Sequence, residues 1–250
     1  MVGEEARPAP SWEPVRPRTL VDQAVEAIVG GAARGVILPG DRIVERELAH
    51  ALGISRVPVR EALRLLESQG VVSSEPYRGI RLTPVTRDRL SQVIEVRVVL
   101  ETTAARRALI RKQNKGVALR GLEKIVRELE LMATREDAYG LACADAAFHR
   151  ELCKLSGNDV LCKMWESLSR QLTIVVGLST LDKSMDGIVE EHRVLIETFA
   201  RGKGAELDRA LEEHIRVKND ALDFESIIEQ RRIMRDRGAA GPGTKLHGQR

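Results

Sequence analysis

Apolar residues recur at two different spacings along the chain, and the first zone, residues 18–84, mixes short helical patterns with turns. Helices are predicted in "LVDQAVEAIVGGAA" and, after a short β-prone stretch in "RGVILPGDRI", in "ERELAHAL", which is expected to bury Leu48, Ala51 and Leu52. After Gly53, Ser55 can cap a third helix that stops at Gly70. The third helix is expected to bury Val59, Ala62, Leu63 and Leu66. Pro58 is tolerated in the third helix because it lies in the first turn. Two short strands, "VVSS" and "GIRLT", follow and are joined by the tight turn "EPYRG". Helices around a short turn, followed by a β-hairpin, are typical of a winged helix-turn-helix.

The second zone, residues 85–236, shows helical periodicity throughout and no convincing strand. Short loops such as "SGND" and "RGKG" imply that neighbouring helices are antiparallel. The expected fold class is mainly α: an N-terminal winged helix-turn-helix with a small β-hairpin wing, and a C-terminal all-α bundle of six antiparallel helices. The six helices are expected at about residues 86–111, 115–133, 137–155, 159–179, 185–201 and 204–231.

Composition narrows the class of protein. Residues 1–17 hold four of the nine prolines and no apolar period, and residues 237–250 have a similar composition, so both ends are predicted to be disordered tails. The sequence contains no 18-residue apolar span and no apolar block of a signal peptide near its start. Three cysteines form neither a CxxC pair nor an even framework, which favours reduced, buried thiols in a cytoplasmic protein.

The basic residues are unevenly distributed. The formal net charge is only +3, but the first lysine is Lys112, and every basic residue before it, apart from histidine, is arginine. Arginine suits forked contacts with guanine or phosphate, although genomic base composition could produce the same bias. Arg56 and Arg60 stand one turn apart at the start of the third predicted helix. They could read something outside the protein, or they could form a solvated face of an interaction helix.

A dense series of motif residues runs through "GVILPGDRIVERELAHALGISRVPVREALRLLESQGVV". In order, they are Gly35, Pro39-Gly40-Asp41, Glu47-Leu48-Ala49, Leu52-Gly53, Ser55-Arg56, Pro58-Val59-Arg60-Glu61-Ala62-Leu63, Leu66 and Gly70. This stretch resembles the DNA-binding domain of GntR-type bacterial transcription regulators. The all-helical second zone is similar to the FCD effector domain of the FadR-like branch, in its smaller VanR-type version. Together the two resemblances cover about residues 18–235.

The resemblance implies that the third helix enters the major groove of DNA. Its N-terminal residues would then face base edges, and Arg56 and Arg60 could reach guanine. Ser55 and the free backbone amides at the helix start are placed for a phosphate, and Pro58 lies in the same first turn. By motif, the resemblance adds three further DNA-binding positions: Arg46 on the preceding helix, Gly79 in the wing near the minor groove, and Arg78 beside it at a phosphate.

Four residues of the second zone suggest a metal site. Asp145 and His149 are spaced i and i+4 in "LACADAAFHREL", and His192 and His214 each fall in an apolar helical stripe. A lone inward histidine is usually a satisfied core residue, but three imidazoles and one carboxylate are costly in a helical core unless they are paired. The resemblance points the same way, since many FCD domains hold a metal ion with an Asp-x-x-x-His pair and two later histidines. Three nitrogens and one oxygen suit Zn²⁺, Ni²⁺ or Mn²⁺.

A further inward charge lies in the first helix of the second zone. Arg97 lines up with Leu90, Ile94 and Glu101, so it could form a structural salt bridge with Glu101. It could instead capture a carboxylate, because a guanidinium pairs with one through two parallel hydrogen bonds. Family members use an arginine in this helix for organic acids.

These features lead to three readings of function. The first is a transcription regulator, a repressor released by a small carboxylic-acid effector, acting as a homodimer on a short pseudo-palindromic operator in double-stranded DNA. The second is a metal-dependent enzyme. Two features argue against this hypothesis: the sequence shows no separate general base, and the chain carries a DNA-binding domain. The third gives the metal a purely structural role. We expect the first, with no membrane association.

Overall fold

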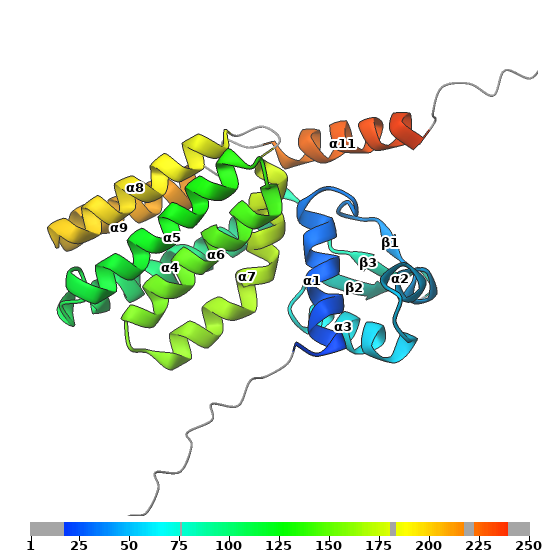
Figure 1. Cartoon of the computed structure of the whole chain (residues 1–250), viewed down its shortest axis with the longest axis horizontal. Helices are drawn as coiled ribbons and strands as arrows, with labels where there is room; N and C mark the ends of the chain where they lie inside the picture. The colour runs from blue at the N-terminus through cyan, green and yellow to red at the C-terminus, as the bar shows by residue number, and fades with distance from the viewer. Residues whose placement is uncertain (1–17, 76, 181–183, 218–222, 240–250) are drawn as a thin grey trace, which may run out of the picture.

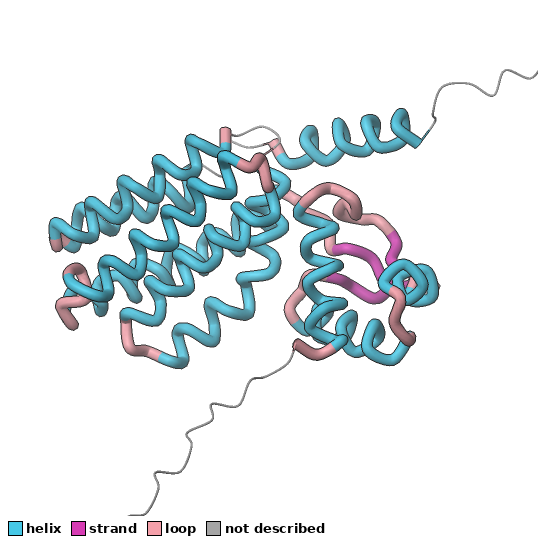
Figure 2. The backbone as a smooth tube through the Cα atoms, in the orientation of Figure 1, coloured by secondary structure: helices cyan, strands magenta, loops and turns pink. Residues whose placement is uncertain are grey.

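A computed structural model describes residues 18–75, 77–180, 184–217 and 223–239. The expected tail at 1–17 and residues 240–250 of the expected tail at 237–250 lie outside the described residues. The N-terminal part, which we call the winged domain, has helices and strands in the predicted order. They are α1 (Leu20–Ala33), β1 (Arg42–Ile43), α2 (Glu45–Leu52), α3 (Arg56–Ser68), β2 (Val72–Glu75) and β3 (Gly79–Leu82). The strands form one antiparallel sheet in the order β1-β3-β2, and the described strands all lie in this domain (Figure 2).

Local interactions explain where the helices of the winged domain begin and what they bury. Thr19 caps α1, because its side chain accepts from the backbone N–H of Asp22. In return, the Asp22 carboxylate accepts from the backbone N–H of Thr19. Helix α3 buries the four residues expected of it, Val59, Ala62, Leu63 and Leu66. The prediction for α2 was wrong in part, because Ala51 is exposed and Ala49 is buried instead. Residues two apart on a helix lie about 200° apart, so only one of these two can face the core.

The C-terminal part begins as an antiparallel helical bundle, which we call the helical bundle. Its helices are α4 (Arg87–Ile110), α5 (Gly116–Thr134), α6 (Ala138–Leu155), α7 (Asp159–Ser179), α8 (Met185–Arg201) and α9 (Gly204–Glu212). Side chains of Thr86, Asp137, Asn158 and Ser184 cap four of them. The first five helices lie within a residue or two of the expected ranges, and the expected mainly-α fold class is confirmed.

The sixth predicted helix, 204–231, is wrong as a single element. Helix α9 ends at Glu212, and the next residues form a π-helical turn, η1 (Glu213–Val217). After residues that are not described, a separate helix α11 (Phe224–Ala239) begins, with the Asp223 side chain accepting from the backbone N–H of Ser226. Helix α11 continues to Ala239, past residue 237, where the C-terminal tail was expected to begin.

Helix α11 leaves the bundle and lies against the winged domain (Figure 1). Its first turns are anchored by the buried side chains of Phe224 and Ile228. Farther along, Arg232 Nη2 donates to the carbonyl of Pro39 at 3.2 Å, and Arg235 forms an ion pair with Asp41. The last of the described helices therefore contacts the loop that precedes β1.

The winged domain also packs directly on the bundle through α1 and α7. A Cβ atom placed on Gly177 of α7 would lie 2.6 Å from Cβ of Ala33, so only glycine allows the observed approach. Nearby, Gln171 Nε2 donates to the backbone oxygen of Gln69 at 2.6 Å. The two parts are thus held together by close packing as well as by hydrogen bonds.

Two broader expectations can be compared with the described residues. None of the described helices is long and apolar enough to cross a membrane. All three cysteines are free, but only Cys153 is fully buried. The expectation of three buried thiols is wrong for Cys143, which is exposed, and for Cys162, which is half-buried.

Candidate metal centre and nucleic-acid interface

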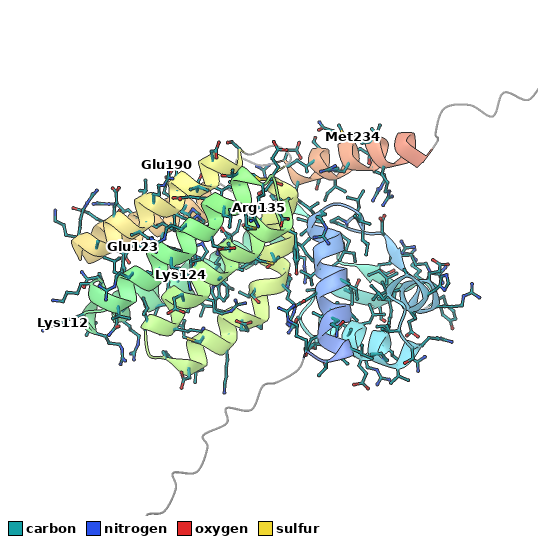
Figure 3. The ribbon with its side chains drawn as sticks, viewed as in Figure 1. Lys112, Glu123, Lys124, Arg135, Glu190 and Met234 are labelled. Carbon is teal, nitrogen blue, oxygen red and sulfur yellow. The ribbon has the colours of Figure 1, made fainter. Side chains whose placement is uncertain are left out.

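Four side chains from three elements of the bundle meet in its interior. Asp145 and His149 come from α6, His192 from α8 and His214 from η1. All four are buried, and their candidate donor atoms lie within 4.8 Å of one another. The outer surface of the same bundle is charged, with Lys124 of α5 and Glu190 of α8 directed to solvent (Figure 3).

An oxygen atom lies close to Nδ1 of each histidine. His149 Nδ1 lies 2.6 Å from Glu101 Oε2, and His214 Nδ1 lies 3.1 Å from Glu191 Oε2. His192 Nδ1 lies 2.8 Å from the carbonyl oxygen of Ile188. Carbonyl and carboxylate oxygens only accept, so a hydrogen bond at each of these contacts requires the ring proton on Nδ1. The Nε2 lone pairs are therefore left to face the centre, as in the histidines of metal sites.

These lone pairs crowd one another and the Asp145 carboxylate. His149 Nε2 lies 3.1 Å from His214 Nε2, and His192 Nε2 lies 3.3 Å from Asp145 Oδ1. His192 Nε2 is buried and has no hydrogen-bond partner among the described residues. An ion with bonds of about 2.1 Å sets its neighbouring donors about 3.0 Å apart at right angles and about 3.4 Å apart in a tetrahedron. The donor set and its spacing fit one divalent cation.

The protonation states suit a metal as well. Burial lowers the pKa of His149 below its ordinary value, and burial lowers the pKa of His214 to about 3 despite the hydrogen bond to Glu191. Burial alone would raise the pKa of Asp145, but the neighbouring His192 and the His149 ring lower it below its usual range. Neutral imidazoles and an ionised carboxylate are the forms that bind metal ions.

Arg97 is buried beside this cluster. Its Nε donates to Glu101 Oε1 at 2.7 Å, so the salt bridge considered from the sequence is present. The same oxygen accepts from Trp165 Nε1 at 2.8 Å. Although burial raises the pKa of Glu101, Arg97 and His149 lower it to about 2. Arg97 Nη2 is buried without a hydrogen-bond partner among the described residues, so one guanidinium nitrogen has donor hydrogens that a ligand could use.

At the other end of the molecule, the expected recognition helix α3 presents its arginines to solvent. Arg56 Nη2 and Arg60 Nη2 lie 3.4 and 3.1 Å from Glu45 Oε2 on α2. Ser55 is the N-cap residue, as expected, but its side chain makes no capping hydrogen bond to the helix. Pro58 lies half-buried in the first turn.

The remaining residues expected at DNA lie around the wing. Arg46 is exposed on α2, and Arg78 is exposed and 3.1 Å from Glu75. Gly79 has a φ of 74°, a conformation that favours glycine and lets the wing turn tightly. Arg42, Arg46, Arg56 and Gly79 help to line a groove of about 270 Å³ between strands β1 and β3 and the first residues of α2 and α3.

Sequence reasoning missed several partners. Glu101 was considered only as a partner of Arg97, whereas it also contacts His149 and Trp165. Glu191 and Glu45 were not singled out at all. Their signal was weak, because acidic residues on exposed-looking helical positions usually form a solvated face.

Comparisons with known proteins agree with this geometry. Residues 20–82 match the model of the bacterial regulatory proteins of the gntR family, and residues 92–217 match the FCD domain. The chain is 27% identical over 197 residues to a probable D-xylose utilization operon transcriptional repressor of Paenarthrobacter nicotinovorans, covering 79% of this chain and 86% of the relative. It is 30% identical to the uncharacterized HTH-type transcriptional regulator YdhC of Bacillus subtilis, covering 65% and 73%. The solved structure of E. coli McbR/YncC superimposes with a TM-score of 0.68 at 21% identity, covering 86% and 99%.

Proposed function

The chain belongs to the gntR family of bacterial regulatory proteins and carries an FCD domain, and from this premise we propose that it is a homodimeric repressor that a small organic acid releases from its operator. It is a transcriptional regulator, not an enzyme, as are the relatives it matches. Repression is the part we infer, and it is supported by the word repressor in the name of the matched Paenarthrobacter protein. Operator binding places the proposed function in the cytoplasm.

The proposed DNA contacts use the N-terminal turn of α3 and the wing. Arg56 and Arg60 would leave Glu45 and pair with guanine edges or phosphates of double-stranded DNA. Ser55, Pro58 and Arg46 border the same surface, and Arg78 and Gly79 would follow the backbone at the wing. A homodimer would bring two such surfaces to a pseudo-palindrome. The side chains of Val96 and Val99 on α4 remain exposed and support a dimer contact there.

The proposed cofactor is one divalent ion, Zn²⁺, Ni²⁺ or Mn²⁺, held by Asp145, His149, His192 and His214. The observation that supports it is the convergence of three Nε2 lone pairs on a buried carboxylate. When bound, the ion would supply a Lewis-acidic position for an oxygen of the effector. The protein's own part is to lower the pKa of His149 and His214 by burial and to bring the three imidazoles together around Asp145.

The proposed effector is a small carboxylic acid bound near this centre. The single observation that carries it is the buried Arg97, which keeps one nitrogen without a partner among the described residues. Only a Glu101 carboxylate separates the guanidinium from the candidate ligand His149. A carboxylate of the effector would satisfy the unused nitrogen.

The test is a thermal-shift screen of small carboxylic acids, run on the full chain with and without Zn²⁺, followed by operator binding. An acid that raises the melting temperature should also weaken operator binding, and Arg97→Met should abolish both effects while leaving operator binding intact. If metal raises the melting temperature but no acid alters DNA affinity, the centre is structural and the effector proposal is wrong.

A further inference from the structure

One buried carboxylate, that of Glu101, lies between three helices of the bundle. It accepts from Arg97 Nε on its own helix α4 at 2.7 Å and from Trp165 Nε1 of α7 at 2.8 Å, both at Oε1. Its other oxygen, Oε2, lies 2.6 Å from His149 Nδ1 of α6. Glu101, His149 and Trp165 are completely buried, so no solvent competes for these contacts.

The division of the two oxygens fixes where the protons are. Arg97 and Trp165 can only donate, so Oε1 is committed to them. Neither Oε2 nor His149 Nδ1 has a well-aligned hydrogen-bond partner among the described residues, so their 2.6 Å contact is the place where each atom can be satisfied. An ionised carboxylate has no proton to give, so the hydrogen of this contact belongs to the imidazole. His149 is thereby held with a proton on Nδ1 and a lone pair on Nε2.

We propose that Glu101 is a positioning residue for the candidate metal centre, because it sets the tautomer of His149 and so makes Nε2 a metal donor. The inference rests on the proposed metal site and deepens it. Glu101 does not touch the ion's position itself, which the four ligand atoms surround. Its effect on metal binding passes through one hydrogen bond.

Glutamine at this position should reverse the tautomer. In Glu101→Gln, the amide oxygen must face Arg97 and Trp165, since two donors would clash with the amide NH₂. The NH₂ group then points at His149 and donates to Nδ1. The single ring proton moves to Nε2, where it blocks the metal. All three contacts of the side chain are kept in nearly the same geometry, and only the direction of donation between position 101 and His149 changes.

The chain offers a matched control. Glu191 makes the equivalent contact to His214 Nδ1 at 3.1 Å, and it lies on α8, a different helix from Glu101. Glu191→Gln therefore removes the same charge at the same centre without touching His149. A second variant controls for stability. Glu101→Gln leaves the buried Arg97 without its nearest counter-charge. The double variant Arg97→Met/Glu101→Gln removes both charges and keeps the Trp165 donor that orients the amide.

The experiment measures ¹⁵N chemical shifts of histidine in the metal-free full chain and Zn²⁺ affinity by chelator competition. In the wild type, His149 should carry its proton on Nδ1. In Glu101→Gln and in the double variant it should carry it on Nε2, with Zn²⁺ affinity lowered about 10- to 100-fold. The double variant should regain thermal stability without regaining affinity, which a merely structural role could not produce. In Glu191→Gln, the His149 tautomer should stay as in the wild type.

Three outcomes would overturn the inference. They are a wild-type His149 protonated on Nε2, an unchanged tautomer in both glutamine variants, and a double variant that recovers Zn²⁺ affinity together with stability. The wild-type spectrum decides the point even where Glu101→Gln fails to fold. Failure of the proposed metal site looks different: the tautomers would follow the prediction while the wild type fails to bind Zn²⁺.

Discussion

Replacing Gly177 by alanine should force the winged domain and the helical bundle apart. The added Cβ atom would lie 2.6 Å from Cβ of Ala33 and 2.7 Å from its carbonyl oxygen. The carbonyl belongs to the backbone and cannot rotate away like a side chain, so α1 and α7 must separate by about 1 Å to reach ordinary contact. Such overpacking costs about 1–3 kcal/mol.

A second effect of the same substitution has the opposite sign. Alanine is favoured over glycine by about 1 kcal/mol in the interior of a helix, which offsets part of the clash. Gly121 on α5 isolates this effect, because a Cβ atom there meets nothing within 4 Å. Gly121→Ala should therefore stabilise the chain by about 1 kcal/mol. Gly177→Ala should fall below Gly121→Ala by the full overpacking cost of about 1–3 kcal/mol.

The assay is denaturant unfolding of both variants, combined with hydrogen exchange across α1. Exchange near Ala33 should accelerate in Gly177→Ala and stay unchanged in Gly121→Ala, since only the first disturbs the contact between the domains. If Gly177→Ala stabilises the chain as much as Gly121→Ala and exchange is unaltered, then α1 and α7 do not approach as closely in solution as described, and the reasoning fails.

Three further predictions concern the DNA surface, the metal and the last helix. Arg56→Ala or Arg60→Ala should each weaken operator binding by roughly 1–3 kcal/mol in a fluorescence titration at moderate salt, and unchanged affinity in both would exclude α3 as the reading element. His192→Ala should remove the rise in melting temperature that Zn²⁺ gives the wild type, and a retained rise would place the ion elsewhere. The ion pair of Asp41 and Arg235 should dock α11 at neutral pH. The pKa of Asp41 is lowered in the folded chain, because hydrogen bonds from Arg235 and a backbone amide outweigh burial, so this contribution is present above the unfolded pKa near 4 and lost as pH falls through the folded value. Protease cleavage near α11 should accelerate only at such acid pH in the wild type and already at neutral pH in Arg235→Ala.

The sequence predicted most of the helices because amphipathic periodicity and capping residues are local signals. Asn158 and Ser184, for example, start α7 and α8 without help from distant residues. The interruption after α9 carries no such signal. Leu207, Leu211 and Ile215 keep a four-residue spacing straight through the π-helical turn, so the apolar pattern reads as one continuous helix.

The candidate metal site was also predictable only in part: its four ligand residues were found from the sequence, and the acceptors that contact the histidines were not. Asp145, His149, His192 and His214 each stand on an inward stripe, and a common interior brings them together. Their supporting acceptors depend on which helices meet, and that is a property of packing. Glu191 directly precedes His192 in sequence, yet it contacts His214.

Helix α11 also determines how far the winged domain can swing. The winged domain is joined to the bundle by the short link from Leu82 to Arg87 and by the packing of α1 on α7, and the ion pair at Asp41 adds a third attachment that restricts rotation about the other two. In a dimer, this additional attachment would make the protein intolerant of operators whose half-sites are spaced one or two base pairs wrongly. A chain that ends before Phe224 should bind a wider range of spacings, each with lower affinity, because the freed domain must be ordered anew on every site.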